Sequence, residues 1–286
     1  MNLKGVNIAV ISRSTGQSPN LSSADDKIIR AVLQKLRNRC LSADLYTEEE
    51  FISLPVTQDV VVNMCRLEKS LAKLQCLEDD GVLVINSGYA IKSCTRRRLA
   101  ELFKQYNIPA PLSAVVKTDS SEMPFGGEFY PCWLKLPDNP TVIREDIAFA
   151  KTPQEYKRAL DAYAQRGVKE VFVSRHLHGD LVKFYSVSGS GFLHTMYPTL
   201  SGHSKFGYEE NNDPVKSIPF SCERLSQICR VASEVTGISV FGGDCIIAAD
   251  GEPYIIDFND WPSFSGCVEE GSDSIVELIM DKIKER

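Results

Sequence analysis

Residues 239–263 read SVFGGDCIIAADGEPYIIDFNDWPS, two apolar runs joined by the dipeptide Asp250–Gly251. This dipeptide favours a two-residue turn between antiparallel strands. If these are the two turn residues, counting outward along both strands places Asp244 directly opposite Asp257. The stretch therefore predicts a β-hairpin with two carboxylates side by side on one face.

The paired carboxylates predict a metal site. Directly opposed residues have Cβ atoms about 4.5–5.5 Å apart, and two like charges so placed destabilise a strand pair. A divalent cation between them reverses this effect. Asn259 follows Asp257 by two residues, points to the same face and adds an amide oxygen. Such oxygen ligands suit Mg²⁺, or Mn²⁺ in its place, so we expect Asp244, Asp257 and Asn259 to bind metal rather than to be incidental acids of a solvated hairpin.

Two lysines interrupt apolar strands upstream of the hairpin. Lys135 lies in YPCWLKL (130–136) and Lys183 in GDLVKFYSV (179–187). A lysine in a strand commonly marks an edge or a solvated face. Near a metal site and beside aromatic residues, both lysines favour contacts to phosphate. The chain has neither a G-x-x-x-x-G-K-[ST] motif nor a strand-linked G-x-G-x-x-G, which excludes P-loop and Rossmann binding.

Composition narrows the class of protein. The 286 residues are 43% hydrophobic and 24% charged, ordinary for a globular protein of about two domain equivalents. The net charge of −6 argues against a nucleic-acid partner. No apolar run approaches the ~18 residues of a membrane span, and the first run is too short for a signal sequence, so we expect a cytoplasmic protein without a membrane partner. Nine cysteines without a C-x-x-C pair predict free thiols.

Hydrophobic patterns divide the chain into three parts. In the first, short apolar runs alternate with helical patterns, which predicts a parallel α/β domain. The later parts mix strands and helices and end in a helix expected to begin at a Ser272/Asp273 cap. The polar stretch 195–219 predicts a loop facing the substrate. The expected strands are 6–12, 43–46, 60–63, 81–86, 131–136, 146–150, 170–175, 180–187, 240–248 and 254–259, and the main helices 25–39, 95–106, 153–165 and 222–236.

In this order, the α/β domain, the two lysines and the metal hairpin resemble the ATP-grasp superfamily over nearly the whole chain. The resemblance implies a mixed α/β and α+β fold. Its parts would be a pre-ATP-grasp domain (1–92), a central subdomain (93–178) and a C-terminal subdomain (179–286). It also implies that Mg²⁺ and ATP bind between the two subdomains and that the γ-phosphoryl group is transferred.

The resemblance assigns roles to individual residues. It implies that Lys135 contacts the α- and β-phosphates, that residues 170–177 form the adenine hinge, and that Lys183 contacts the nucleotide. Many members carry a glycine-rich loop after the first lysine. Residues 137–145 have no glycine, so Arg144 or Thr141 is expected to serve instead. The expected nucleotide-binding residues are Lys117, Lys135, Arg144, Ser174, Arg175, His176, Leu177, Asp180 and Lys183; the catalytic residues are Lys183, Lys205 and Asp257.

The acceptor site is expected near Arg13, Arg96, His203 and Lys205. Arg96 begins an arginine run at a helix start, which is typical of a solvated helix face and, alternatively, of a residue that captures an anionic substrate. His176 and His178 alternate along one strand like a metal pair. Two histidines leave a metal short of ligands, so a structural role is favoured for them.

Three functions remain open. Carboxylate–amine ligases, including RimK-like ones, dominate the superfamily, and we favour a ligase that makes an acyl phosphate on a small-molecule or peptide acceptor. Such ligases commonly place an arginine before the metal hairpin, whereas residues 184–220 contain none. Residues 239–244 and 256–263 also resemble the inositol trisphosphate 5/6-kinase branch, in which a base such as Asp257 or His203 could assist. The third alternative is an ATP-binding protein without turnover. Many relatives are dimers, and the sequence leaves open whether this chain is one.

Overall fold

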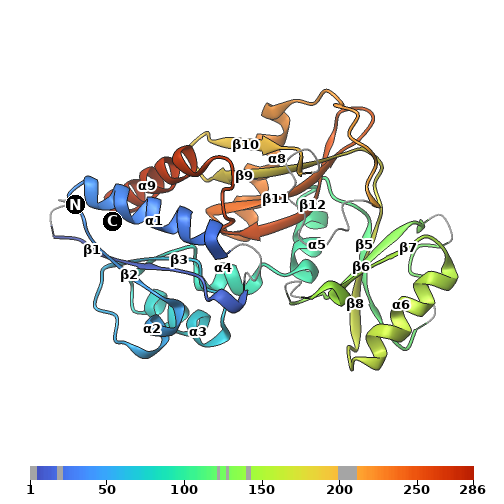
Figure 1. The fold of residues 1–286 in the computed structure, drawn as a ribbon, viewed down its shortest axis with the longest axis horizontal. Helices are drawn as coiled ribbons and strands as arrows, with labels where there is room; N and C mark the ends of the chain where they lie inside the picture. Colours follow the sequence, from blue (N-terminus) through green and yellow to red (C-terminus); the bar gives the residue numbers. More distant parts are fainter. Residues whose placement is uncertain (1–4, 18–21, 121–122, 127–128, 140–142, 199–210) are drawn as a thin grey trace.

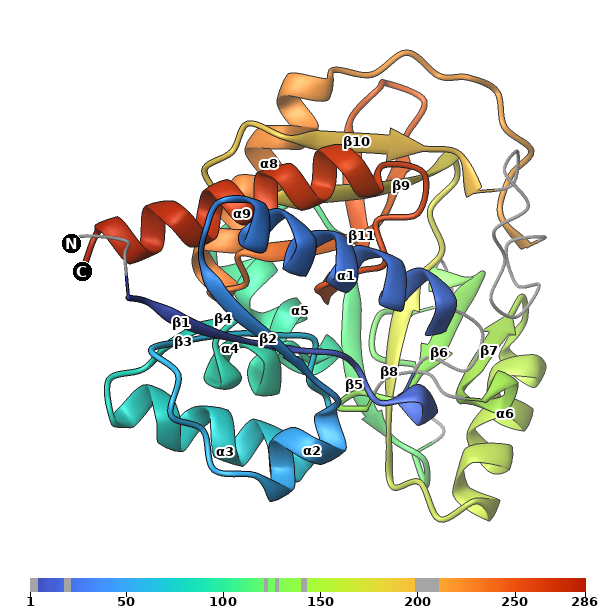
Figure 2. The ribbon, with the colours of Figure 1, turned by 60° about the vertical axis from the view of Figure 1, so that its left-hand side comes forward.

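The computed structural model describes residues 5–17, 22–120, 123–126, 129–139, 143–198 and 211–286. These residues form three four-stranded sheets that follow one another along the chain (Figures 1 and 2). Three residues expected in the site, Thr141, His203 and Lys205, lie outside the described residues.

The first sheet is parallel, with strand order β2-β1-β3-β4. Its two central strands, β1 and β3, are nearly continuous apolar runs because helices cover both faces. Helix α1 packs on one face, and α2 and α3 pack on the other (Figure 1). The elements are β1 (Asn7–Ile11), α1 (Ser22–Asn38), β2 (Ser42–Tyr46), α2 (Glu48–Ser53), β3 (Val60–Asn63), α3 (Glu68–Asp79), β4 (Leu83–Ile85) and α4 (Gly88–Ser93).

The second sheet is antiparallel, in the order β5-β8-β6-β7. Helix α6 (Pro153–Gln165) covers one face, starting at the Thr152 cap with a proline in its first turn. Because side chains alternate along a strand, Trp133 and Lys135 lie on the face away from α6. The strands are β5 (Ser113–Lys117), β6 (Cys132–Lys135), β7 (Ile147–Ala150) and β8 (Glu170–Arg175).

The third sheet is also antiparallel, in the order β10-β9-β11-β12. One of its faces is covered by α8 (Cys222–Thr236) and by α5 (Arg96–Gln105), whose Phe103 meets Phe258 edge to face at 6.2 Å. The strands are β9 (Asp180–Val187), β10 (Leu193–Met196), β11 (Val240–Ile247) and β12 (Pro253–Asp260). The other face carries the polar residues of the hairpin.

The last helix, α9 (Val268–Lys284), leaves the third sheet and packs beside α1 (Figures 1 and 2). Trp261 and Phe264 therefore share one core with Ile8 of β1 and Val32 of α1. The boundaries expected at residues 92 and 178 thus separate segments that are packed together. Among the described residues, the second sheet and α6 form a core of their own.

Several elements differ from expectation. Helix α9 begins at Val268, and Ser272 lies buried inside it with its hydroxyl donating to the Glu269 carbonyl at 3.0 Å, so a Ser272/Asp273 cap is wrong. Strand β10 extends into the stretch expected to be a loop, because it pairs with β9 across the turn near Gly189. Strand β5 and helices α2 and α4 were not expected.

Two expectations about the chain as a whole can be compared with the structure: membrane spans and the state of the cysteines. In the described part of the chain, no helix combines the length and apolar character needed to cross a bilayer. The nine cysteines are free thiols, and five of them are buried.

Candidate active site

The metal hairpin has the pairing expected from the sequence. Asp244 on β11 lies opposite Asp257 on β12, and Gly242 lies opposite Asn259. Directly paired residues share a face, and residues two apart along a strand do so as well. Asp257 and Asn259 are also in contact, because the Asn259 side chain donates a hydrogen bond to the Asp257 carboxylate. The two carboxylates and the amide are therefore adjacent.

The turn that produces this pairing is not the expected one. The Ala248 amide donates to the Glu252 carbonyl at 3.1 Å, so the loop has three residues and ends at Gly251 with φ +81°. A third residue in the loop moves the register by one position. A β-bulge next to Asp244, with Ile256 as the extra residue, moves it back. The two deviations cancel.

Strand β9 adds Lys183 to the hairpin. Lys183 lies directly opposite Asp244, and its ammonium is 2.7 Å from the Asp244 carboxylate. Loss of solvent lowers the pKa of Lys183, but the charge and hydrogen bond of Asp244 outweigh it, and the pKa is raised overall. Lys183 is therefore a cation at neutral pH.

Lys135 and Arg96 come from other elements and act on Asp257 of the metal hairpin. Lys135 ends β6 of the second sheet, and Arg96 begins α5. Loss of solvent is the largest influence on Lys135 and lowers its pKa, against the attraction of Asp257 and Asp244. Loss of solvent would raise the pKa of Asp257, but Lys135, Arg96, Asn259 and Lys183 lower it overall. Lys135, Arg96 and Lys183 thus all attract the charge of Asp257, and Lys183 also contacts Asp244.

An aromatic wall adjoins Lys135. Trp133, two residues earlier on the same face, lies 4.5 Å from Phe149 between ring centroids, and Phe149 lies 5.3 Å from His176. The indole N–H of Trp133 donates to Nδ1 of His176 at 3.1 Å. Ser174 pairs with Trp133 and so shares this face. Flat apolar rings beside a lysine suit a ligand that has a planar base and phosphates.

The arrangement of the three sheets matches that of known structures. The D-alanine–D-alanine ligase from Bacillus anthracis, in complex with ATP, superimposes with a TM-score of 0.67 at 12% identity, covering 98% of this chain and 99% of that chain. A RimK domain ATP-grasp protein from Sphaerobacter thermophilus gives 0.69 at 14% identity, covering 95% and 98%. The D-alanine–D-alanine ligase from Coxiella burnetii gives 0.67 at 12%, covering 98% and 96%.

This chain has the ATP-grasp fold. The fold expected from the sequence is thereby confirmed. No protein-family model and no curated protein matches the chain in sequence. At 12–14% identity the likeness concerns the fold, and the roles of residues have to be argued from this chain's own geometry.

Several expected nucleotide-binding residues are exposed or lie away from the face that carries Lys135. Lys117 shares the face of Lys135 but is exposed at the end of β5, paired with Glu170. Arg175 is exposed on the opposite face, paired with Cys132. Arg144 is exposed in a short 3₁₀ helix (Arg144–Asp146) after the Lys135 strand, and Leu177 is half-buried after β8.

Asp180 has a different role from the one expected. It is fully buried, and its two carboxylate oxygens accept the backbone N–H groups of Lys216 and Ile218, each at 2.7 Å. A carboxylate enclosed in this way has no oxygen left to contact ribose or phosphate. Asp180 instead fastens the segment before α8 to β9.

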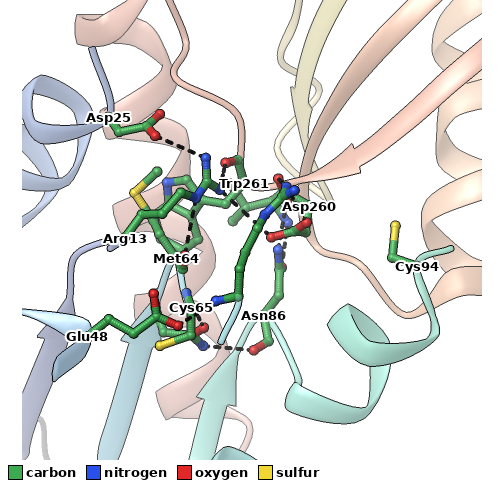
Figure 3. Close-up of polar contacts among 12 residues, drawn as sticks. Arg13, Asp25, Glu48, Met64, Cys65, Asn86, Cys94, Asp260 and Trp261 are labelled. Carbon is green, nitrogen blue, oxygen red and sulfur yellow. Dashed lines mark hydrogen bonds and ion pairs between the residues drawn. The ribbon is translucent and has the colours of Figure 1, made fainter. Parts of the chain in front are cut away.

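Arg13 was expected near the acceptor, but its side chain contacts other parts of this chain (Figure 3). Its guanidinium donates to the Asp25 carboxylate at 3.1 Å and to the carbonyls of Met64 and Trp261 at 3.3 and 2.8 Å. Its side chain is 7% exposed. Arg13 therefore joins the loop after β1 to the end of β12, and it does not present a free cation to an acceptor.

The two histidines gain a third neighbour in the structure. His178 Nδ1 lies 3.2 Å from Asp213, and ligand atoms of His176, His178 and Asp213 lie within 4.8 Å of one another. The Trp133 N–H, however, donates to Nδ1 of His176. A neutral ring that accepts at Nδ1 carries its hydrogen on Nε2, which leaves no free nitrogen for a metal. The structural role favoured from the sequence agrees with this contact.

Three site residues were missed from the sequence. Trp133 and Tyr185 each lie two residues from an expected lysine, so strand alternation was a sufficient signal for both. His194 on β10 pairs with Tyr185, and their rings stack with centroids 6.2 Å apart. Only the β9–β10 register places His194 on the face of Lys183.

Proposed function

We propose that this chain is a Mg-ATP-dependent ligase that activates an acceptor carboxylate as an acyl phosphate for attack by an amine. The observation that carries the proposal is the convergence of Lys135, Lys183 and Arg96 on the metal hairpin. Phosphoryl transfer depends chiefly on positioning and on neutralising negative charge. The ligases that share this fold support the choice of reaction.

The hairpin fits a magnesium ion. Asp244 and Asp257 oppose each other as like charges, and Asn259 adds a neutral oxygen, which is a donor set that Mg²⁺ prefers. These three residues would hold the metal, which supplies positive charge to the phosphates of ATP when bound. Lys183 would share Asp244 with the metal and reach the transferred phosphoryl group.

Of the other residues near the hairpin, some would bind the phosphates of ATP and some its adenine base. Lys135 would contact phosphate oxygens. Arg96 donates through Nη1 to the carbonyls of Leu136 and Asn139 at 3.0 Å each, so it would act chiefly by its positive charge near Asp257, as the arginine that residues 184–220 lack. Trp133 and Phe149 would flank the base. The backbone of residues 174–177 would give the hinge its hydrogen bonds.

The proposed ligase reaction has two steps, phosphoryl transfer to the acceptor and then transfer of the acyl group to the amine. A carboxylate oxygen of the acceptor attacks the γ-phosphorus, the bond from that phosphorus to the β–γ bridging oxygen breaks, and ADP leaves. An amine nitrogen then attacks the acyl carbon, phosphate departs with the electron pair of the C–O bond, and the amine loses a proton. The acceptor would be a small molecule or a peptide.

A second candidate, phosphorylation of a hydroxyl, is favoured by one observation. His194 and Tyr185 share the face of Lys183, so an imidazole stands beside the transfer site. A hydroxyl has to lose a proton to attack, and histidine is the commonest general base. An ionised carboxylate needs no such base.

The deciding experiment follows ATP consumption with Mg²⁺ against pooled carboxylates, amines and polyols, and asks where the phosphate goes. Free phosphate that appears only with a carboxylate and an amine together supports the ligase. Phosphate retained on a hydroxyl, with ADP as the other product, supports the kinase and overturns the ligase. Binding of ATP without consumption in any pool would point to a protein without turnover.

A further inference from the structure

Strand β11 of the metal hairpin is fastened to the first sheet by Asn86. The side-chain oxygen Oδ1 of Asn86 accepts the backbone N–H groups of Ser239 and Val240 at 2.9 and 2.8 Å, and the side-chain NH₂ group donates to the Val240 carbonyl at 2.8 Å. The amide thus replaces a neighbouring strand at the start of β11. Asn63 fixes Asn86 in turn, by donating to the carbonyls of Ile85 and Asn86 at 3.2 and 2.9 Å.

Strand β12 is fastened at its far end, through Asp260. Arg66 donates to the Asp260 carboxylate at 2.6 Å and to its carbonyl at 3.3 Å. Arg13 donates to the next carbonyl, that of Trp261, and lies 3.9 Å from the second Asp260 oxygen (Figure 3). The Asp260 side chain is 7% exposed, so both arginines act in a site with little water. Asp260 directly follows Asn259, a proposed metal ligand.

The two arginines are themselves held in place. Arg66 is fixed at its backbone, where its N–H donates to Glu48 at 2.6 Å, and the other Glu48 oxygen accepts the Ser14 N–H at 3.0 Å. Glu48 is fully buried. The loops after β1 and β3 are therefore joined to each other and, through Arg13 and Arg66, to the end of β12.

Metal affinity is sensitive to such outer contacts. A site works only when its ligands stay within about 0.5 Å of the productive geometry. Partners that orient a metal ligand change metal affinity by about 10–100-fold when they are removed. Arg66 donates both to the side chain and to the backbone carbonyl of Asp260, the residue after Asn259. These two contacts limit rotation of the backbone that carries Asn259.

We propose that Arg66, acting through Asp260, is a positioning residue for Asn259, so that the first sheet sets the geometry of the metal site. The inference rests on the proposed function, because it takes Asn259 as a metal ligand. The alternative is a contact that only joins two parts of the fold, which would change stability and leave metal affinity unaltered.

The test measures the affinity of Mn²⁺ by electron paramagnetic resonance in the presence of the non-hydrolysable analogue AMP-PNP. Arg66→Gln and Asp260→Asn should each weaken Mn²⁺ binding by about 10–100-fold. Because the two residues act as a unit, combining both substitutions should not lower the Mn²⁺ affinity below that of the single variant that binds Mn²⁺ more weakly. Both contacts of Arg66 with Asp260 come from one nitrogen, Nη2. Arg66→Lys keeps the charge but has a shorter side chain, so its Mn²⁺ affinity should lie between those of wild type and Arg66→Gln.

The matched control is Arg39→Gln. Arg39 pairs with Glu277 and so also joins the first part of the chain to the last, but at the α1–α9 contact. Thermal unfolding of every variant identifies those that fold, and Arg66→Lys provides a test if Arg66→Gln does not. Unchanged Mn²⁺ affinity in folded Arg66 variants would overturn the inference. A wild-type protein that binds neither Mn²⁺ nor AMP-PNP would instead overturn the proposed function, and the inference with it.

Discussion

Asp257 lies in a place where loss of solvent raises its pKa and so disfavours its negative charge. Lys135, Arg96 and Lys183 attract the charge, and the Asn259 amide donates to it, so its pKa is lowered overall. Asp244 faces it across the strand pair and contacts Lys183 at 2.7 Å. At the scale of single residues, the proposed binding of metal and phosphates rests on this balance of acids and cations.

Replacing Asp257 by asparagine tests that balance. Asp257→Asn should lower turnover by at least about 100-fold, because even outer partners of metal ligands cost 10–100-fold. ATP binding should be weaker but detectable by calorimetry, since the lysines remain. Asp281→Asn, at an exposed ion pair on α9, is the control and should leave both quantities unchanged. Full activity of Asp257→Asn would show that the metal assignment is wrong.

His176 should make the fold sensitive to acid. Burial, and then the neighbouring His178, lower the pKa of His176 from its usual 6.5. As the pH falls through about 6.5, the unfolded chain takes up a proton that the folded chain does not, so stability decreases. His176→Asn keeps an acceptor for Trp133 but cannot titrate. Its melting temperature should fall less than that of the wild type between pH 7 and pH 5. Equal slopes would assign the acid sensitivity to another group.

At the scale of elements, the metal hairpin depends on close packing of its strands. Gly243 lies between β9 and β12, and a Cβ built there would be 2.0 Å from the Asp257 carbonyl oxygen. The absence of a side chain is therefore required for Asp257 to approach Asp244. The β-bulge at Ile256 then restores the register that the three-residue loop shifts.

The segment before α8 provides the prediction at this scale. Asp180→Asn replaces one accepting oxygen by an NH₂ group that faces the N–H of Lys216 or Ile218. A buried donor left unpaired costs about 1–3 kcal/mol, so the free energy of unfolding should fall by that amount. ATP affinity should not change in the folded protein. Asp26→Asn, at an exposed pair, is the control. A loss of ATP affinity without a loss of stability would restore Asp180 as a nucleotide ligand.

At the scale of the molecule, one core joins the beginning of the chain to its end, and another belongs to the second sheet and α6. Ile279 of α9 lies in the core that also holds strands of the first sheet, whereas Leu160 of α6 lies in the core of the second sheet. The first and third sheets should therefore open together, and the second sheet on its own.

Two core variants test this division. Ile279→Ala should lower stability by about 2–5 kcal/mol. It should reduce hydrogen-exchange protection of β1, β3 and β11 alike, while β6 and β8 keep theirs. Leu160→Ala should do the reverse. Protection lost evenly over all three sheets in either variant would show that the chain unfolds as one unit.

The order of elements and much of the site could be predicted because both follow local rules. Apolar runs located most strands, and alternation placed Asp257 and Asn259 on one face. Strands β5 and β10 escaped because none of their residues is fully buried, and a half-exposed strand needs no continuous apolar run. Helices α2 and α4 escaped because six residues carry little periodicity. The pairing of Asp244 with Asp257 was predicted correctly from a turn that was wrong in detail, since the bulge compensates for it.

The sequence was enough to predict the mixed α/β fold, the strand pair that carries Asp244, Asp257 and Asn259, and the two lysines on strands. The packing of the sheets decides which other polar residues are occupied by distant segments. Asp180 and Arg13 look like ligands in the sequence, yet packing gives them backbone partners from segments far along the chain. Lys135 and Arg96 meet the hairpin only through folding. Contacts between distant segments depend on how whole sheets pack, and no local spacing encodes them.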